Sequence, residues 1–112
     1  MAKKKEQFDI LKKKMIQFLD ERDWENFHTP KNVAMSIAIE AAELMELLQW
    51  TNPERSAVVS NQELMSQIKD EIADIVIYTI SLGLSLDIDV FECVLAKMEK
   101  NSERFPPKSK PK

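Results

Sequence analysis

Glycine is nearly absent from this sequence of 112 residues, in which Gly83 is the only one. A phosphate-binding P-loop and a dinucleotide-binding turn both need several glycines, because the backbone must approach the phosphate closely. The sequence therefore excludes both, and any phosphate chemistry must use side chains and metal ions. The same scarcity argues against a sheet protein with many tight hairpin turns.

Cysteine and long apolar runs are also scarce. Cys93 is the only cysteine, so no disulfide can form within the chain, which fits a reducing cytoplasm. No apolar run reaches transmembrane length, and we expect no secretory leader. A net charge of −3 gives no support for nucleic-acid binding. We therefore expect one cytoplasmic domain over residues 1–112, with frayed basic tails at 1–5 and 106–112 and no membrane or nucleic-acid partner.

The apolar residues recur with a helical period, and no convincing strand interrupts them. Thr29 followed by Pro30 predicts the start of one helix. Two capping-box pairs, Ser60 with Glu63 and Asp89 with Glu92, predict the starts of two more helices. We expect an all-α, four-helix-bundle-like fold with a turn or short helical piece after the Asn-Pro at 52–53. The predicted helices span about 4–22, 30–50, 61–86 and 90–104.

Four acidic residues form two matched pairs, Glu40 with Glu43 and Glu71 with Asp74. The spacing i, i+3 places both members of a pair on one face of a helix. Both pairs lie in apolar stretches, where an unpaired carboxylate is costly to bury. Converging carboxylates repel one another unless a cation neutralises them, and oxygen ligands suit Mg²⁺. The alternative is that these acids are the solvated faces of ordinary amphipathic helices, which would explain one pair better than two.

The spacing of the two pairs along the chain supports a shared site. If the two helices form an antiparallel hairpin, residues equidistant from its apex face each other. The acidic pairs place that apex near residue 57, within a turn-rich stretch of about residues 51–61. The hairpin predicted from local turn signals would therefore bring both acidic pairs level.

Aromatic residues accompany the acidic pairs. Trp50 follows Glu43 by seven residues, and Tyr78 follows Asp74 by four, so each shares a helix face with an acid. Such rings could stack on a nucleobase, although both could equally be core or interface residues. Trp24, in a predicted connector, is a further candidate for the wall of a base site.

Basic and amide side chains offer possible phosphate contacts. Lys97, Asn101 and Arg104 form one stripe of donors on the last helix, which is otherwise an ordinary solvated face. Lys31 and Asn32 lie at the start of a helix, where backbone N–H groups already favour anions.

His28 is the only histidine and follows Glu25 in an E-x-x-H pattern. Di-iron bundles use two such patterns, and this chain has one. We expect His28 to make local hydrogen bonds in the connector, with substrate contact as the next alternative and metal ligation as the last.

Taken together, these residues resemble the MazG-type all-α nucleoside triphosphate pyrophosphohydrolases, and within them the small dCTP pyrophosphatase-like branch. The resemblance covers about residues 21–106, most of the chain. The segments that carry it are ERDWENFHTPKN (21–32), EAAELMELLQW (40–50), DEIADIVIY (70–78) and KMEKNSERFP (97–106). Together they are specific, whereas any one alone would be weak.

The resemblance implies a role for each group of candidates. Mg²⁺, or Mn²⁺ in its place, would be held by Glu40, Glu43, Glu71 and Asp74. Base contacts would come from Trp24, Trp50 and Tyr78, and phosphate contacts from Lys97 and Asn101. It also implies a homodimer or homotetramer with sites near the subunit interfaces. The first helix of dCTP-specific relatives often carries histidine where Met15 stands here, so the resemblance leaves cytosine selectivity open.

Our hypothesis is therefore Mg²⁺-dependent hydrolysis of a nucleoside triphosphate, such as dCTP or a related deoxynucleotide, to monophosphate and pyrophosphate. Such an activity would serve to clean the nucleotide pool. The metal would activate a water for attack on the α-phosphorus, and Glu40 or Glu43 would orient or deprotonate that water. The competing hypotheses are a helical oligomer that binds nucleotides or a partner without catalysis, and a di-iron carboxylate protein.

Overall fold

A computed structural model of the chain describes residues 2–22 and 29–108. These residues form helices and contain no strand, so the prediction of an all-α chain is confirmed. None of the helices found in the two described segments is long and apolar enough to cross a membrane. The helices are α1 (Ala2–Glu21), α2 (Pro30–Glu46), α3 (Arg55–Ser60), α4 (Gln62–Ser85) and α5 (Val90–Arg104).

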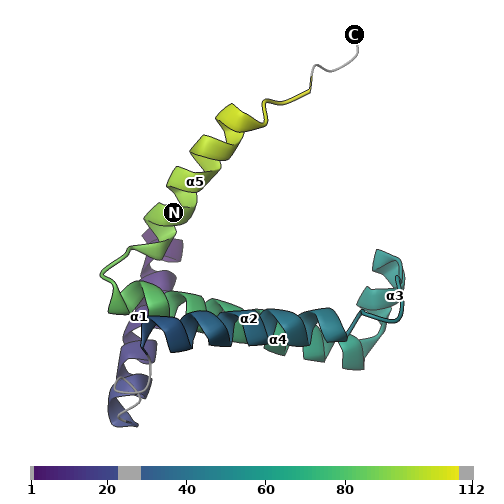
Figure 1. Cartoon of the computed structure of the whole chain (residues 1–112), viewed down its shortest axis with the longest axis horizontal. Coiled ribbons are helices and arrows are strands. Elements are labelled where there is room, and N and C mark those ends of the chain that lie inside the picture. Colours follow the sequence, from purple (N-terminus) through teal and green to yellow (C-terminus); the bar gives the residue numbers. More distant parts are fainter. Residues whose placement is uncertain (1, 23–28, 109–112) are drawn as a thin grey trace.

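The centre of the molecule is an antiparallel hairpin of α2 and α4, which run side by side (Figure 1). The short helix α3 lies at the closed end of this hairpin, where the spacing of the acidic pairs predicted the apex. At the open end α1 crosses α4, and α5 leads away from the hairpin (Figure 1). The predicted hairpin is thus the element on which the other helices are arranged.

Side-chain caps fix where three of the helices begin. Thr29 and Asp89 cap α2 and α5 as predicted, each accepting a hydrogen bond from the backbone N–H three residues on. The prediction for α4 was wrong by one residue. Its cap is Asn61, whose side chain accepts from the N–H of Leu64 at 3.0 Å. Ser60, the predicted cap, is the last residue of α3, and its hydroxyl donates to a carbonyl one turn back.

Two helix boundaries differ from the prediction. α1 begins at Ala2, so the lysines at 3–5, which we expected to fray, are helical. Lysine, glutamate and glutamine are good helix formers, which explains the extension. α2 ends at Glu46 rather than at Trp50, and the chain continues through turns with i to i−3 hydrogen bonds. Pro53 opposes continuation of the helix beyond residue 52, because its ring would clash with a carbonyl four residues back.

The elbow between α4 and α5 needs the one glycine of the chain. The N–H of Ile88 donates to the carbonyl of Gly83 at 2.8 Å, and Asp87 adopts a left-handed conformation with φ of 54°. This is the usual geometry of a helix C-terminus closed by a reversed turn. A Cβ atom at position 83 would collide with the Cγ2 of Val90. Gly83 therefore allows α5 to start directly against α4.

Replacing Gly83 by alanine is expected to lower the free energy of unfolding by about 1–3 kcal/mol, because the added methyl group has no room. Thermal unfolding followed by circular dichroism would measure the loss. The double variant with Val90→Ala, which removes the colliding methyl group, should lose less than the sum of the two single variants. Strict additivity would mean that the close approach at this elbow is unimportant.

The hydrophobic core of the isolated chain is small. Among the described residues, the buried apolar side chains are Met15, Val33 and Ile80. The radius of gyration is 17.5 Å, against roughly 13 Å for a compact domain of this length. Large apolar side chains remain exposed on several helices, and those on α5 are Phe91, Val94, Leu95, Met98. The single chain thus leaves much of its apolar surface uncovered.

Candidate functional site

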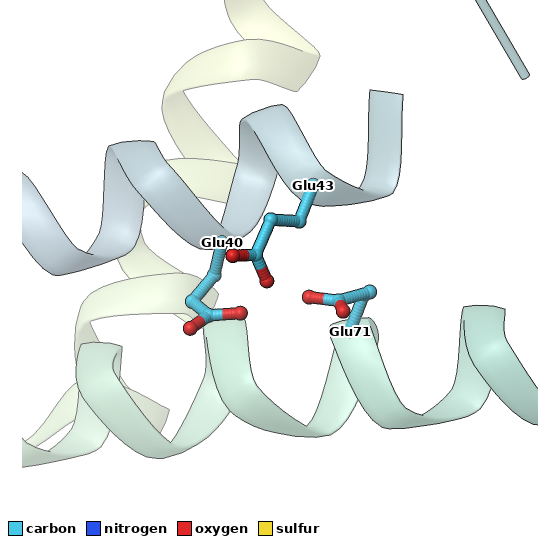
Figure 2. Close-up of side chains that lie close together, drawn as sticks. All are labelled: Glu40, Glu43 and Glu71. Carbon is cyan, nitrogen blue, oxygen red and sulfur yellow. The ribbon is translucent and has the colours of Figure 1, made fainter. Parts of the chain in front are cut away.

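Three of the four predicted carboxylates converge between α2 and α4. Glu40 and Glu43 descend from α2, one turn apart, and Glu71 rises from α4 to meet them (Figure 2). One carboxylate oxygen from each lies within 4.8 Å of the other two. We refer to these residues as the acidic trio. The i, i+3 spacing on α2 and the antiparallel packing of α4 together produce this convergence.

Within the acidic trio Glu43 is exposed, whereas Glu40 and Glu71 are half-buried and each has an oxygen without a partner among the described residues. The Oε2 atoms of Glu40 and Glu71 are buried and accept no hydrogen bond from the part of the chain that the structure describes. A buried, unpartnered carboxylate oxygen is costly, so each such atom calls for an explanation. A divalent cation bound between the three carboxylates would satisfy both atoms and relieve the repulsion between them. The donor set, oxygen atoms alone, fits a hard cation such as Mg²⁺.

The proximity of the carboxylates changes the pKa of Glu40. Its pKa is raised from 4.5 to about 7, chiefly because its protonated form can share a hydrogen bond with Glu71. Burial, a second hydrogen bond with Glu43, and the negative charges of Glu43 and Asp74 contribute in the same direction. Below about pH 7 and without a cation, the site therefore retains a proton on Glu40.

Asp74, the fourth predicted ligand, lies beside the acidic trio without belonging to it. Its charge acts on Glu40, yet its carboxylate is not part of the group of mutually close oxygens. Aspartate is one methylene shorter than glutamate, so a carboxylate at this position reaches less far across the hairpin. Asp74 also lines a separate cavity, and it thereby connects the acidic trio with that cavity.

The cavity has a volume of about 340 Å³ and lies between α1 and α4. Its wall on α4 includes Tyr78, which the sequence analysis selected, and Ser81, which it did not. The wall on α1 includes Met15, the position that the family resemblance linked to cytosine selectivity. The other α1 residues of the wall were missed as part of a site, although their apolar stripe with helical spacing was visible in the sequence. The lining residues are Leu11, Lys14, Met15, Phe18, Leu19, Asp74, Ile77, Tyr78 and Ser81.

Trp50 lies on the opposite side of the acidic trio from this cavity. It follows the end of α2, toward α3, and 85% of its surface is exposed. The possibility that Trp50 is a core residue of the single chain is therefore wrong. Tyr78 lies toward the C-terminal half of α4, so one chain does not bring Trp50 and Tyr78 to the same point. Trp24 and His28 lie outside the described residues, and their roles remain predictions.

The predicted phosphate contacts are not assembled around the acidic trio of one chain. Lys97, Asn101 and Arg104 are exposed on α5, which leads away from the hairpin (Figure 1). Lys31 and Asn32 are exposed in the first turn of α2. They precede the acidic trio by about two and a half helical turns, roughly 13 Å along the helix axis.

Raising the pH is expected to destabilise the metal-free protein. Because the pKa of Glu40 is raised in the folded state, the folded protein binds more protons than the unfolded chain between about pH 4.5 and 7. The stability contributed by this proton is full below pH 4.5 and is lost as the pH rises through 7. Melting temperatures measured in EDTA across this range should fall more for the wild type than for Glu40→Gln.

Added Mg²⁺ should oppose that loss, since the cation and the proton compete for the same oxygens. We expect the melting temperature to rise with Mg²⁺ at pH 8 and to respond much less at pH 5. Equal pH slopes for the wild type and Glu40→Gln, with no response to Mg²⁺ at either pH, would contradict a cation site in the acidic trio.

The MazG-like family matches residues 35–110, which include the acidic trio and Asp74. The structure is similar to the crystal structure of a pyrophosphatase from Archaeoglobus fulgidus, with a TM-score of 0.81 and 38% sequence identity. That similarity covers 90% of this chain and 94% of the other.

Related sequences include dCTP pyrophosphatase 1 from two mammals. The chain is 34% identical over 93 residues to the protein of Mus musculus and 35% identical over 91 residues to that of Homo sapiens. Each match covers 80% of this chain and 54% of the relative. The chain thus spans about half the length of these relatives.

Proposed function

Since this chain belongs to the MazG-like family, we propose that it is an enzyme that hydrolyses nucleoside triphosphates to monophosphate and pyrophosphate. The observation that carries the proposal is the acidic trio, with two buried carboxylate oxygens that lack a partner. A module that only binds other proteins has no use for such a costly cluster. The dCTP pyrophosphatase relatives favour dCTP or a related deoxynucleotide, and a role in cleaning the nucleotide pool.

The metal of this proposal is Mg²⁺, with Mn²⁺ able to replace it. Glu40, Glu43 and Glu71 would hold it, and Asp74 would complete the set from the neighbouring turn of α4. When bound, Mg²⁺ would neutralise charge on the phosphate oxygens and act as a Lewis acid.

The chain's own contribution to the reaction is to orient a water and take its proton. Glu40 or Glu43 accepts the proton while the water oxygen forms a bond to the α-phosphorus. The bond from the α-phosphorus to the oxygen that bridges it to the β-phosphorus breaks, and pyrophosphate leaves with that oxygen. The chain has no P-loop that could position a γ-phosphate for attack. This lack supports attack at the α-phosphorus.

The cavity beside Asp74 is the proposed place for the nucleobase. Tyr78 offers an aromatic face there, and the apolar side chains from α1 exclude water from the ring. The phosphates would lie toward the acidic trio. Trp50, Lys97, Asn101 and Arg104 remain proposed substrate contacts, and a second copy of the chain would be needed to bring them to the same nucleotide.

We expect a homodimer or homotetramer in solution. The small core, the large radius of gyration and the exposed apolar side chains of α5 all leave surface that a second copy could cover. Light scattering at micromolar concentration should give two or four times the 13.0 kDa of one chain. A mass of one chain would refute both the oligomer and the contacts proposed across it.

The test of the function is to incubate the purified protein and Mg²⁺ with a panel of nucleoside triphosphates and identify the products. Monophosphate and pyrophosphate should form in equal amounts. Orthophosphate as the first product would overturn the assignment. Binding of nucleotides without any turnover would instead favour a non-catalytic nucleotide-binding oligomer.

A further inference from the structure

The cavity between α1 and α4 contains few polar groups, and most of them are already accounted for. Asp74 faces the acidic trio, where its charge acts on Glu40. Tyr78 already takes part in another interaction. Lys14 lines the cavity from an exposed position on α1. Ser81 is the remaining polar residue of the cavity wall.

Ser81 differs from the other polar residues because it is buried and unpaired. Only 6% of its surface is exposed, and it lines the cavity. Its hydroxyl makes no hydrogen bond to any residue that the structure describes in α1 to α5. A serine hydroxyl on a helix usually bonds to a carbonyl one turn back, as the neighbouring Thr79 does at 2.7 Å. Ser81 therefore offers the cavity a free donor and acceptor.

The position of Ser81 relative to Asp74, which lies beside the acidic trio, fits a nucleotide. Seven residues separate Ser81 from Asp74, so the two lie on the same face of α4, two turns apart. That spacing is about 10 Å along the helix axis, the scale of the separation between a nucleobase and its phosphates. A nucleotide with its phosphates beside Asp74, at the edge of the acidic trio, would therefore place its base beside Ser81.

We propose that the Ser81 hydroxyl hydrogen-bonds the nucleobase of the substrate and helps to set the base preference of the enzyme. This inference rests on the proposed function, because it assigns a role within the same substrate site. Apart from Lys14, Asp74 and the hydroxyl of Tyr78, the wall around Ser81 is apolar, so it contacts a base mainly by the faces of the ring. A single hydroxyl in such a cavity discriminates, since a base that cannot pair with it leaves it unsatisfied.

Ser81→Ala tests this role, and Thr79→Val is its matched control. Both variants remove one hydroxyl from α4, at positions two residues apart. The Thr79 hydroxyl, however, already donates a hydrogen bond to the carbonyl of Ile75. For each protein, kcat/KM would be measured on a panel of deoxynucleoside triphosphates that differ only in the base. Melting temperatures would be recorded on the same preparations.

Ser81→Ala should lower the ratio of kcat/KM between the preferred and the poorest nucleotide by roughly 2- to 10-fold, the effect of one neutral hydrogen bond. The loss should fall mainly on KM, with a melting temperature no lower than that of the wild type. Thr79→Val should leave the ratio unchanged, whatever it does to the melting temperature.

The outcomes separate this inference from the proposed function. If the wild type is active and Ser81→Ala keeps the wild-type ratio, the role of Ser81 is overturned and the proposed function stands. The same holds if Thr79→Val changes the ratio equally, or if the wild type hydrolyses all bases alike. A wild type that hydrolyses no nucleotide of the panel overturns both.

Discussion

Turnover should be abolished, with the helices intact, when Glu43 or Asp74 is replaced by alanine. Glu43 belongs to the acidic trio, and Asp74 lies beside it and acts on Glu40 through its charge. Loss of either carboxylate weakens the proposed Mg²⁺ site and the neutralisation of charge that depends on it. We expect kcat to fall at least about a hundredfold, the scale seen when one preorganised electrostatic group is removed.

The metal-free variants should be no less stable than the wild type. Removing one charge from a cluster of carboxylates relieves repulsion, so the melting temperature in EDTA should stay the same or rise. The increase in melting temperature on adding Mg²⁺ should shrink, because the variant binds the cation more weakly. This second measurement tests the metal site independently of activity.

Glu46→Ala is the matched control for Glu43. Glu46 is exposed, lies on the same helix and continues the acidic series, but it is not part of the acidic trio. Its alanine variant should retain turnover and the response to Mg²⁺. Near-normal Mg²⁺-dependent turnover in either Glu43→Ala or Asp74→Ala would refute the assignment of these carboxylates.

Trp50→Ala is the second change with a large expected effect. With 85% of its surface exposed, the side chain contributes little to the stability of one chain, and the melting temperature should change little. If Trp50 stacks on a base, its loss costs roughly 1–3 kcal/mol of binding. We therefore expect kcat/KM to fall by about 5- to 150-fold, mainly through KM, with a smaller loss of kcat than in the carboxylate variants.

Two further variants define what the Trp50 result means. Trp50→Phe keeps an aromatic face and should recover most of the lost kcat/KM. Met45→Ala removes an exposed side chain near the end of α2, five residues before Trp50, and should leave the kinetics unchanged. Unchanged kinetics in Trp50→Ala would rule out the stacking role. A lower oligomer mass in that variant would instead assign Trp50 to the interface between copies.

The features that the sequence determined by itself are those that depend on near neighbours along the chain. Thr29 and Asp89 could be identified as caps because the hydrogen bonds they accept come from only three residues away. The i, i+3 spacing of Glu40 and Glu43 likewise placed them on one face before any packing was known. The turn-rich stretch between α2 and α4 then predicted that the acidic residues of α2 would lie opposite those of α4.

Tertiary structure alone decided which of these residues share a site. Glu71 joins Glu40 and Glu43, whereas Asp74 on the same face of α4 does not. How far a carboxylate reaches across the hairpin depends on the length of its side chain and on how the two helices pack. Nothing local distinguishes Ser81 from Thr79, two residues before it on α4. Ser81 becomes a buried, unpaired group of the cavity only because α1 crosses α4 there, and that contact joins residues more than fifty positions apart in the chain.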